Sequence, residues 1–138
     1  MRLMLDTCVI IDLLVDMDNL GRGAQDIIED PCNIFYASIE TMRELVVHFN
    51  NKKLLNKYFK TSDEVLSAVE NDLKIEFLPV RRDVVYTYAH LRLNEAMAHN
   101  DPSDHIIISH AITERMALLS SDRKFPFYRN QGLELIEY

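Results

Sequence analysis

The chain has few of the residues that interrupt, cross-link or anchor a fold. Its 138 residues include three glycines, four prolines and two cysteines, and no apolar run approaches the roughly 18 residues that a membrane-spanning helix needs. No linker, repeat or low-complexity stretch is present, so we expect one domain over residues 1–138. The N-terminal MRLMLDTCVIIDLL contains aspartates that are foreign to the apolar core of a signal peptide. These absences predict a soluble, cytoplasmic protein.

Positive charge is also scarce. The formal net charge is −7, which argues against a broadly basic surface that neutralises nucleic-acid phosphates. Any basic patch must therefore be local, and a solvated helix surface is the ordinary alternative for the lysines. The candidates are Lys52, Lys53, Lys57 and Lys60, then Arg81 and Arg82, then Arg123 and Lys124.

Several catalytic motifs are missing. The chain has no Gly-rich phosphate loop and no Gly-x-Ser-x-Gly elbow, so nucleotide-dependent transfer and serine hydrolysis have no support. His105 and His110 are five residues apart, and they diverge on a helix instead of forming a zinc pair. Cys8 and Cys32 are too few for a disulfide framework or a metal set, and we expect both to be small buried hydrophobes.

Short apolar runs alternate with helical patterns along the chain. The runs predict strands at RLMLD, NIFYAS, KIEFLPV, MALLSSD and LELIEY. Helices are expected at TCVIIDLLVD, before Pro31, from Ser38 to Phe49, from Thr61 to about Val69, from Asp83 to about Ala98, and from Pro102 to Arg115. This alternation is typical of an α/β domain with a mainly parallel, covered sheet.

The stretch DPSDHIIISHA places two aspartates at the start of an apolar helix. Asp101 before Pro102 suits an N-cap, which leaves Asp104 at the third helical position, where a carboxylate favours the helix dipole. At about 100° per residue, Asp104 shares a face with Ile108 and Ala111 and is directed toward the interior. A buried carboxylate needs a cation or another partner. Capping therefore accounts for Asp101, whereas Asp104 requires a partner elsewhere in the chain.

Two further aspartates end predicted strands. Asp6 closes RLMLD and Asp122 closes ALLSSD. Ligands bind beyond the carboxyl ends of parallel strands, so both carboxylates would enter one crevice if these strands are neighbours. Asp104 begins the helix that leads into the second strand and would lie at the same edge. Three converging carboxylates repel one another, and a bound divalent metal resolves that repulsion.

A fourth acid comes from SIETMRELVVHF. Glu40 and Glu44 both lie off its apolar stripe, so periodicity does not choose between them or exclude that both are surface residues. His99 and His105 flank the turn that holds the two aspartates, and for these we favour a structural role over substrate contact. His110, inside an apolar helix, is expected to be a satisfied core histidine.

These residues together resemble the PIN-domain family, most closely the small VapC-like ribonuclease toxins of bacterial toxin-antitoxin pairs. The resemblance covers the whole chain and rests on LDTCVIIDLL, SIETMREL, DPSDHIIISHA and LLSSDRKF, in this order. It implies a PIN-like three-layer α/β/α domain with a mainly parallel central sheet. It matches the family's acidic residues to Asp6, Glu44, Asp104 and Asp122, which favours Glu44 over Glu40, and it makes Asp101 an auxiliary or capping residue.

The resemblance also implies an activity, a Mg²⁺- or Mn²⁺-dependent endoribonuclease. Asp6, Asp104 and Asp122 would hold the metal, and Glu44 would bind a second ion or orient the attacking water. Arg123 is a candidate contact for a substrate phosphate, with a plain surface arginine as the alternative. Cys8 and His105 depart from the family's frequent asparagine and arginine or glutamine, which leaves substrate contacts open.

Partners follow from the same resemblance. Members of the family commonly form homodimers and are silenced by an antitoxin whose C-terminal segment covers the acidic groove, and the negative charge of this chain suits a basic segment of that kind. Three other functions stay open. They are an RNA-processing nuclease without an antitoxin, a non-catalytic module that binds RNA or protein, and an acidic scaffold whose carboxylates only cap helices. The four retained carboxylates disfavour the binding module.

Overall fold

The computed structural model describes residues 1–51 and 54–138, in which five strands form one sheet with the order β3-β2-β1-β4-β5. Every pairing of neighbouring strands is parallel. The strands are β1 (Arg2–Leu5), β2 (Ile34–Ser38), β3 (Glu76–Leu78), β4 (Ala117–Ser120) and β5 (Leu135–Glu137). The α-helices are α1 (Thr7–Val15), α2 (Arg22–Glu29), α3 (Ile39–Asn50), α4 (Ser62–Ser67), α5 (Arg82–His90) and α6 (Pro102–Glu114). None of the helices in these two ranges is long and apolar enough to cross a membrane.

Shorter helical turns connect these elements. The 3₁₀ turns are Met17–Leu20, Leu54–Lys57, Glu95–Met97 and Pro126–Gln131, and a π-helical turn at Ala68–Asp72 follows α4. Almost every predicted strand and helix is present at its predicted place, because each is encoded by a local apolar pattern and several of the helices also by a side-chain cap. Ser38 and Thr61, for example, cap α3 and α4 with their side chains.

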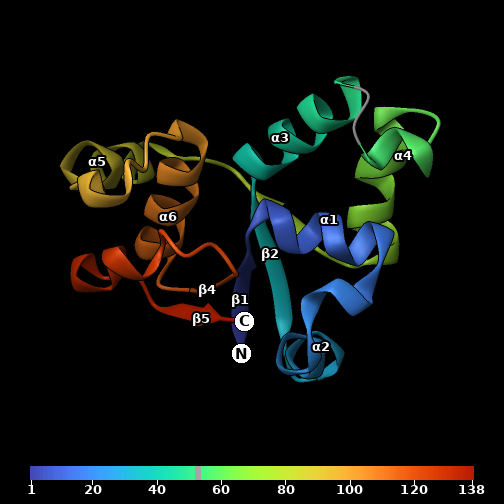
Figure 1. The fold of residues 1–138 in the computed structure, drawn as a ribbon, viewed down its shortest axis with the longest axis horizontal. Helices are drawn as coiled ribbons and strands as arrows, with labels where there is room; N and C mark the ends of the chain where they lie inside the picture. The colour runs from blue at the N-terminus through green and yellow to red at the C-terminus, as the bar shows by residue number, and fades with distance from the viewer. Residues whose placement is uncertain (52–53) are drawn as a thin grey trace.

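Helices cover both faces of the sheet. Leu5 of β1 and Leu119 of β4 belong to a core shared with α1, α2, α3 and α4. Met4 and Leu118, one position earlier in the same strands, belong to a second core shared with α6. Successive strand side chains point to opposite faces, so the two cores lie on the two sides of the sheet. Figure 1 shows the same division, with α5 and α6 to the left of the strands and α1, α2 and α4 to the right. The predicted three-layer α/β/α fold is confirmed.

One predicted helix is too long. The helix expected from Asp83 to about Ala98 ends at His90, and Leu91 is extended. Contacts with a distant segment replace the helical ladder: Arg92 N donates to Gln131 Oε1 at 2.8 Å, and Asn94 N donates to Tyr128 Oη at 3.1 Å. The prediction for Cys32 is also wrong, because this cysteine is exposed in a turn where its N–H donates to Asp30 Oδ1.

The order of the strands reverses at β1. The chain adds β2 and β3 on one side of β1 and then crosses to place β4 and β5 on the other side. The register pairs Leu5 with Leu119, and Asp6 N donates to Leu119 O at 3.1 Å, so β1 and β4 stay together to their carboxyl ends. A reversal of this kind opens a crevice at that edge of a parallel sheet, where α/β proteins bind ligands.

Shortening a side chain in the second core tests this packing. Leu118 is 0% exposed at the centre of β4, and Leu118→Ala is expected to lower the free energy of unfolding by about 2–5 kcal/mol through lost burial and the cavity it leaves. Urea denaturation followed by circular dichroism measures this. The matched control is Val85→Ala on α5, where the side chain is 55% exposed and the change should stay within about 0.5 kcal/mol. Equal losses in both variants would contradict the assignment of Leu118 to a core.

Candidate active site

An acidic cavity of about 270 Å³ lies at the carboxyl ends of β1 and β4. Five carboxylates line it, together with Thr7, Cys8, Ile11 and His48; the acids are Asp6, Glu44, Asp101, Asp104 and Asp122. They come from separate elements: the residue before α1, the middle of α3, the start of α6 and the loop after β4. The convergence predicted for Asp6, Asp104 and Asp122 is therefore present in the structure.

Asp6 is the most constrained of the five acids. It is the N-cap of α1, where its Oδ1 accepts from Thr7 N at 2.8 Å and its Oδ2 accepts from Ser120 Oγ at 2.7 Å. The residue is 5% exposed. Burial raises the pKa of the Asp6 carboxyl, and the hydrogen bonds from Ser120 and Thr7 only partly oppose that rise. The structure thus holds a buried carboxylate in place with donors on both oxygens.

Glu40 and Glu44, which periodicity left equivalent, have different surroundings. Glu44 lines the cavity and accepts from Thr7 Oγ1 at 2.6 Å, and burial raises its pKa. Glu40, one turn earlier, is absent from the cavity lining and pairs with Arg43, while it also accepts from Ser103 Oγ at 2.7 Å. Burial opposes ionisation of Glu40, but the hydrogen bonds from Arg43 and Ser103 outweigh it and lower the pKa.

Ionisation of Asp104 is strongly disfavoured. Its pKa is raised to about 8, first by burial and then by the negative charges of Asp6, Asp101, Asp122 and Glu44. The side chain is 17% exposed, and its Oδ2 lies 2.9 Å from His99 Nε2. A carboxyl shifted this far by burial and like charges marks a place where positive charge would be stabilised.

Backbone amides hold the other two aspartates. Asp101 Oδ1 accepts from Ser103 N at 3.0 Å, so Asp101 caps α6 as predicted. Asp122 Oδ1 accepts from Lys124 N at 2.8 Å in the loop that follows β4. Arg123, in the same loop, is exposed and is not part of the cavity lining.

The basic residues that the structure describes near α3 and α5 are not part of this cavity. Lys52 and Lys53 lie outside the described residues. Lys57 and Lys60 are exposed beyond α3, and Arg81 and Arg82 are exposed at the start of α5. None of these four side chains lines the acidic cavity.

Cys8, expected to be a buried core residue, packs against the first core but is only partly buried. Cys8 is half-buried in the cavity wall, where its Sγ donates to Asp6 Oδ2 at 3.4 Å. Burial raises the pKa of the Cys8 thiol to about 12, with the nearby Asp6 charge adding to the shift. The thiol therefore stays protonated at neutral pH and is unsuited to nucleophilic attack.

The histidines near Asp104 are buried, in line with the structural role that was favoured. His99 and His105 are 1% and 2% exposed, and His105 Nε2 lies 3.0 Å from His99 O. His110 is fully buried with its Nδ1 at 2.9 Å from Ser38 Oγ, but its Nε2 has no hydrogen-bond partner among the described residues, so this core histidine is satisfied at one nitrogen and not at both. The contact of His99 with Asp104 was not predicted, nor were the roles of Ser120 and Thr7. No spacing in the sequence signals them, because hydroxyl and imidazole groups are common beside acidic residues.

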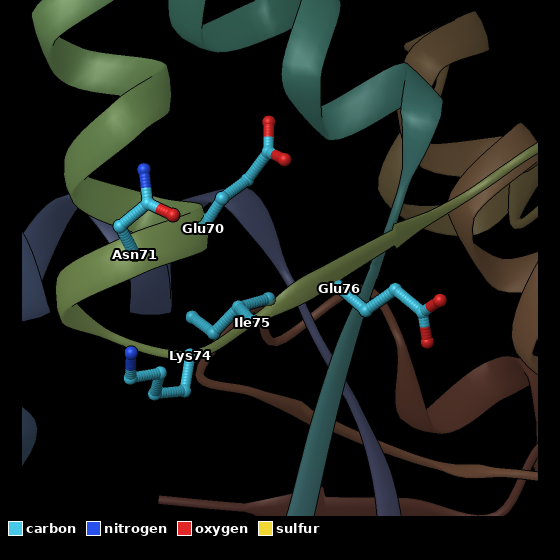
Figure 2. A pocket seen from close by; sticks show the side chains of 5 residues that line it. All are labelled: Glu70, Asn71, Lys74, Ile75 and Glu76. Atoms are coloured by element: carbon cyan, nitrogen blue, oxygen red, sulfur yellow. The ribbon is translucent and has the colours of Figure 1, made fainter.

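Another hollow, of about 320 Å³, lies where the chain enters β3 (Figure 2). It is lined by Glu70, Asn71, Lys74, Ile75 and Glu76. Figure 2 shows the carboxylates of Glu70 and Glu76 directed away from each other and the ammonium of Lys74 directed away from both. Although this hollow is larger, its charged groups do not converge, so the acidic cavity is the better candidate for a catalytic site.

Comparisons with known proteins agree with this architecture. A family model described as PIN domain matches residues 3–131. No curated protein matches the chain.

Solved structures share the fold over their whole length. The crystal structure of VapBC2 from Rickettsia felis, bound to a promoter DNA fragment, contains a chain that is 19% identical with a TM-score of 0.73, covering 99% of this chain and 98% of that chain. A chain of VapBC-1 from nontypeable Haemophilus influenzae is 20% identical with a TM-score of 0.72 and the same coverage. A chain of VapBC-5 from Mycobacterium tuberculosis, a member of the VapBC family of toxin-antitoxin systems, is 23% identical with a TM-score of 0.66, again with 99% and 98% covered.

The raised pKa of Asp104 predicts a pH dependence of stability in EDTA. The folded state holds this proton up to about pH 8, whereas the unfolded chain releases it near the usual 3.8. The stabilisation that Asp104 contributes is fully present below the pKa it has in the unfolded chain. It is lost as the pH rises through the pKa it has in the folded protein. The histidines whose pKa is lowered change the stability only below about pH 6.5, where they begin to take up protons. We therefore expect the melting temperature to fall by a few degrees between about pH 6.5 and 8.5, measured by calorimetry.

Asp104→Asn should reduce this slope, and the part that remains would belong to the other buried acids with a raised pKa, Asp6 and Glu44. Asp63→Asn is the matched control, since Asp63 is an exposed carboxylate on α4 outside the cavity lining, and this variant should keep the wild-type slope. An unchanged slope in Asp104→Asn would contradict the assignment of this titration to Asp104.

Proposed function

Because the chain belongs to the PIN domain family, we propose that it is a metal-dependent endoribonuclease whose active site is the acidic cavity. The observation that carries this proposal is the convergence of Asp6, Glu44, Asp104 and Asp122 on one cavity from separate elements. Carboxylates that served only as caps or surface groups would have no reason to meet. The substrate is the phosphodiester backbone of single-stranded or structured RNA.

The residues of the cavity fit Mg²⁺ or Mn²⁺. Carboxylate oxygens are the ligands that these hard ions prefer. The pKa of Asp104, raised by burial and then by the neighbouring carboxylates, indicates a cluster that lacks positive charge, and a divalent ion would supply that charge. In this proposal Asp6, Asp104 and Asp122 hold the ion, while Glu44 holds a second ion or orients the attacking water.

When bound, a divalent ion supplies the charge that activates water and stabilises the leaving oxygen of a phosphodiester. The protein supplies the positioning. Ser120 and Thr7 hold Asp6 through 2.7 and 2.8 Å hydrogen bonds, and the hydroxyl of Thr7 also donates to Glu44. Thr7 thus links the acid at the end of β1 to the acid on α3, so both are set before substrate arrives. Arg123 is proposed to contact a substrate phosphate beside Asp122.

We further propose that the chain is the toxin of a toxin-antitoxin pair and acts in the cytoplasm as a single-domain homodimer. Similar chains occur in VapBC structures, one of them described as a member of a family of toxin-antitoxin systems. The net charge of −7 and the acidic cavity suit a partner that presents a basic segment. Such a segment would block the site by neutralising the same carboxylates that hold the ion.

Purified protein is expected to cleave a mixed pool of single-stranded RNA in Mg²⁺ or Mn²⁺ and to lose this activity in EDTA. Asp104→Asn should abolish cleavage while its circular dichroism spectrum stays that of the wild type, because one ligand of the ion is lost. Gel analysis of end-labelled RNA measures the cleavage. Activity that persists in EDTA, or in folded Asp104→Asn, would contradict the proposal.

The chain offers a matched pair of controls for this experiment. Glu44→Gln should lower the cleavage rate roughly 100-fold or more, as expected for a group that positions or activates the nucleophile. Glu40→Gln changes the same residue type one turn earlier on α3, outside the cavity lining. It should retain most of the activity. Equal losses in the two variants would indicate a general effect of the helix and would remove Glu44 from the proposed site.

Expression in a bacterial host separates a toxin from an RNA-processing nuclease. Wild-type protein without its partner is expected to arrest growth, because unchecked RNA hydrolysis stops protein synthesis, and Asp104→Asn should allow growth at an equal protein level. Colony counts and immunoblots measure both. Normal growth of cells that contain active wild-type nuclease would favour RNA processing over a toxin role.

A further inference from the structure

A line of buried hydrogen-bonding groups ends on Asp104. Asn94 N donates to Tyr128 Oη at 3.1 Å, Tyr128 Oη lies 2.9 Å from His99 Nδ1, and His99 Nε2 lies 2.9 Å from Asp104 Oδ2. Tyr128 and His99 are 0% and 1% exposed. Neither side chain lines the acidic cavity. The proposed chemistry leaves these buried polar groups without a role.

The partners of His99 determine where its proton lies. Tyr128 Oη already accepts the Asn94 N–H, and its own proton needs an acceptor, which His99 Nδ1 supplies. His99 then carries its proton on Nε2, and it donates to Asp104 Oδ2 once a bound ion has ionised that carboxyl group. The opposite tautomer would leave the buried Tyr128 hydroxyl without an acceptor, and in the ion-bound state it would turn a lone pair toward a carboxylate; both changes are unfavourable.

The ring of His99 is also held by its neighbours. The ring of His105 packs edge-on against it with the centroids 4.6 Å apart, and the ring of Phe125 lies 5.7 Å away. His105 Nε2 lies 3.0 Å from the carbonyl oxygen of His99 and ties down its backbone. With both its edges and its backbone restrained, the imidazole presents Nε2 to Asp104 in one orientation.

We propose that His99, set by Tyr128, is a positioning residue that orients Asp104 for the divalent ion. His99 Nε2 and carboxylate oxygens of Asp104 and Asp122 lie within 4.8 Å of one another, so a direct ligand role for the imidazole is the competing possibility. Nδ1 accepts from Tyr128 and Nε2 donates to Asp104, which leaves neither ring nitrogen with a lone pair for a metal. His99 therefore acts through Asp104. The inference rests on the proposed metal site and assigns residues that hold one of its ligands.

Hydrogen bonds to a metal ligand restrict its rotation and typically contribute about 10- to 100-fold to metal affinity. The bond from His99 occupies Oδ2 of Asp104 and so limits rotation of the carboxylate. Without this hydrogen bond, the Asp104 side chain would sample more orientations. Binding of the ion would then have to order the side chain as well, which lowers the affinity. The expected effect is on the affinity for the ion itself, before any RNA is present.

Mn²⁺ titration followed by electron paramagnetic resonance tests this directly, without RNA. His99→Leu is expected to weaken Mn²⁺ binding by roughly 10-fold or more, and His99→Gln, whose amide can still donate to Asp104, should recover most of the affinity. Tyr128→Phe keeps the ring packing but removes the hydroxyl, and it should weaken binding by a smaller factor. Tyr86→Phe, an exposed tyrosine on α5, is the control and should bind as the wild type does. Tyr128→Phe carries the test if His99→Leu does not fold.

The outcomes separate this inference from the proposed function. If the wild type binds no Mn²⁺, both the metal site and the positioning role are overturned. If the wild type binds and folded variants at His99 and Tyr128 bind equally well, the metal site stands and the positioning role is overturned. Electron spin echo modulation of the Mn²⁺-loaded wild type is expected to show no directly bound nitrogen. A bound-nitrogen coupling that disappears in His99→Gln would make His99 a ligand and would also overturn the positioning role.

Discussion

The parallel pairing of β1 with β4 is the contact on which the acidic cavity depends. It places Leu5 opposite Leu119 and lets Ser120 donate to Asp6, a residue 114 positions away in the chain. Because β2 and β3 lie on one side of β1 and β4 lies on the other, the crevice opens at this boundary. The starts of α1 and α6 and the middle of α3 then meet around it. The five acids come from four places in the chain, with Asp101 and Asp104 both at the start of α6, and the strand pairing determines that they meet.

This convergence works against stability. Asp6, Glu44 and Asp104 all have a raised pKa, with burial as the main cause, because each carboxylate is removed from water among others of its kind. Donors placed around the cavity offset part of this for Asp6 and Glu44: the Ser120 and Thr7 hydroxyls and the Thr7 amide. Functional sites commonly retain such a destabilising arrangement because the activity requires it. In the proposed nuclease, the ion would supply the positive charge that these neutral donors cannot provide to the carboxylates.

The proposed function also requires the ion for recognition. A chain with a net charge of −7 repels a polyanion over most of its surface, and RNA would approach most readily where a divalent ion reverses the local potential. A basic segment of an antitoxin would meet the same carboxylates with the opposite charge. The ion, the RNA and the antitoxin would then all bind at the same carboxylates. Catalysis would require the ion in the cavity, and inhibition would follow when the basic segment occupies it instead.

The sequence by itself determined the alternation of strands and helices, the cap of α6 at Asp101, and the places of Asp6 and Asp122 at strand ends. These features depend on apolar periods and caps that act within a few residues. Only the tertiary structure separated the surroundings of Glu44 from those of Glu40, ended α5 at His90, exposed Cys32 and joined Tyr128 to His99 across 29 positions. Contacts of that range leave no local period, because the packing of whole elements decides which side chains meet.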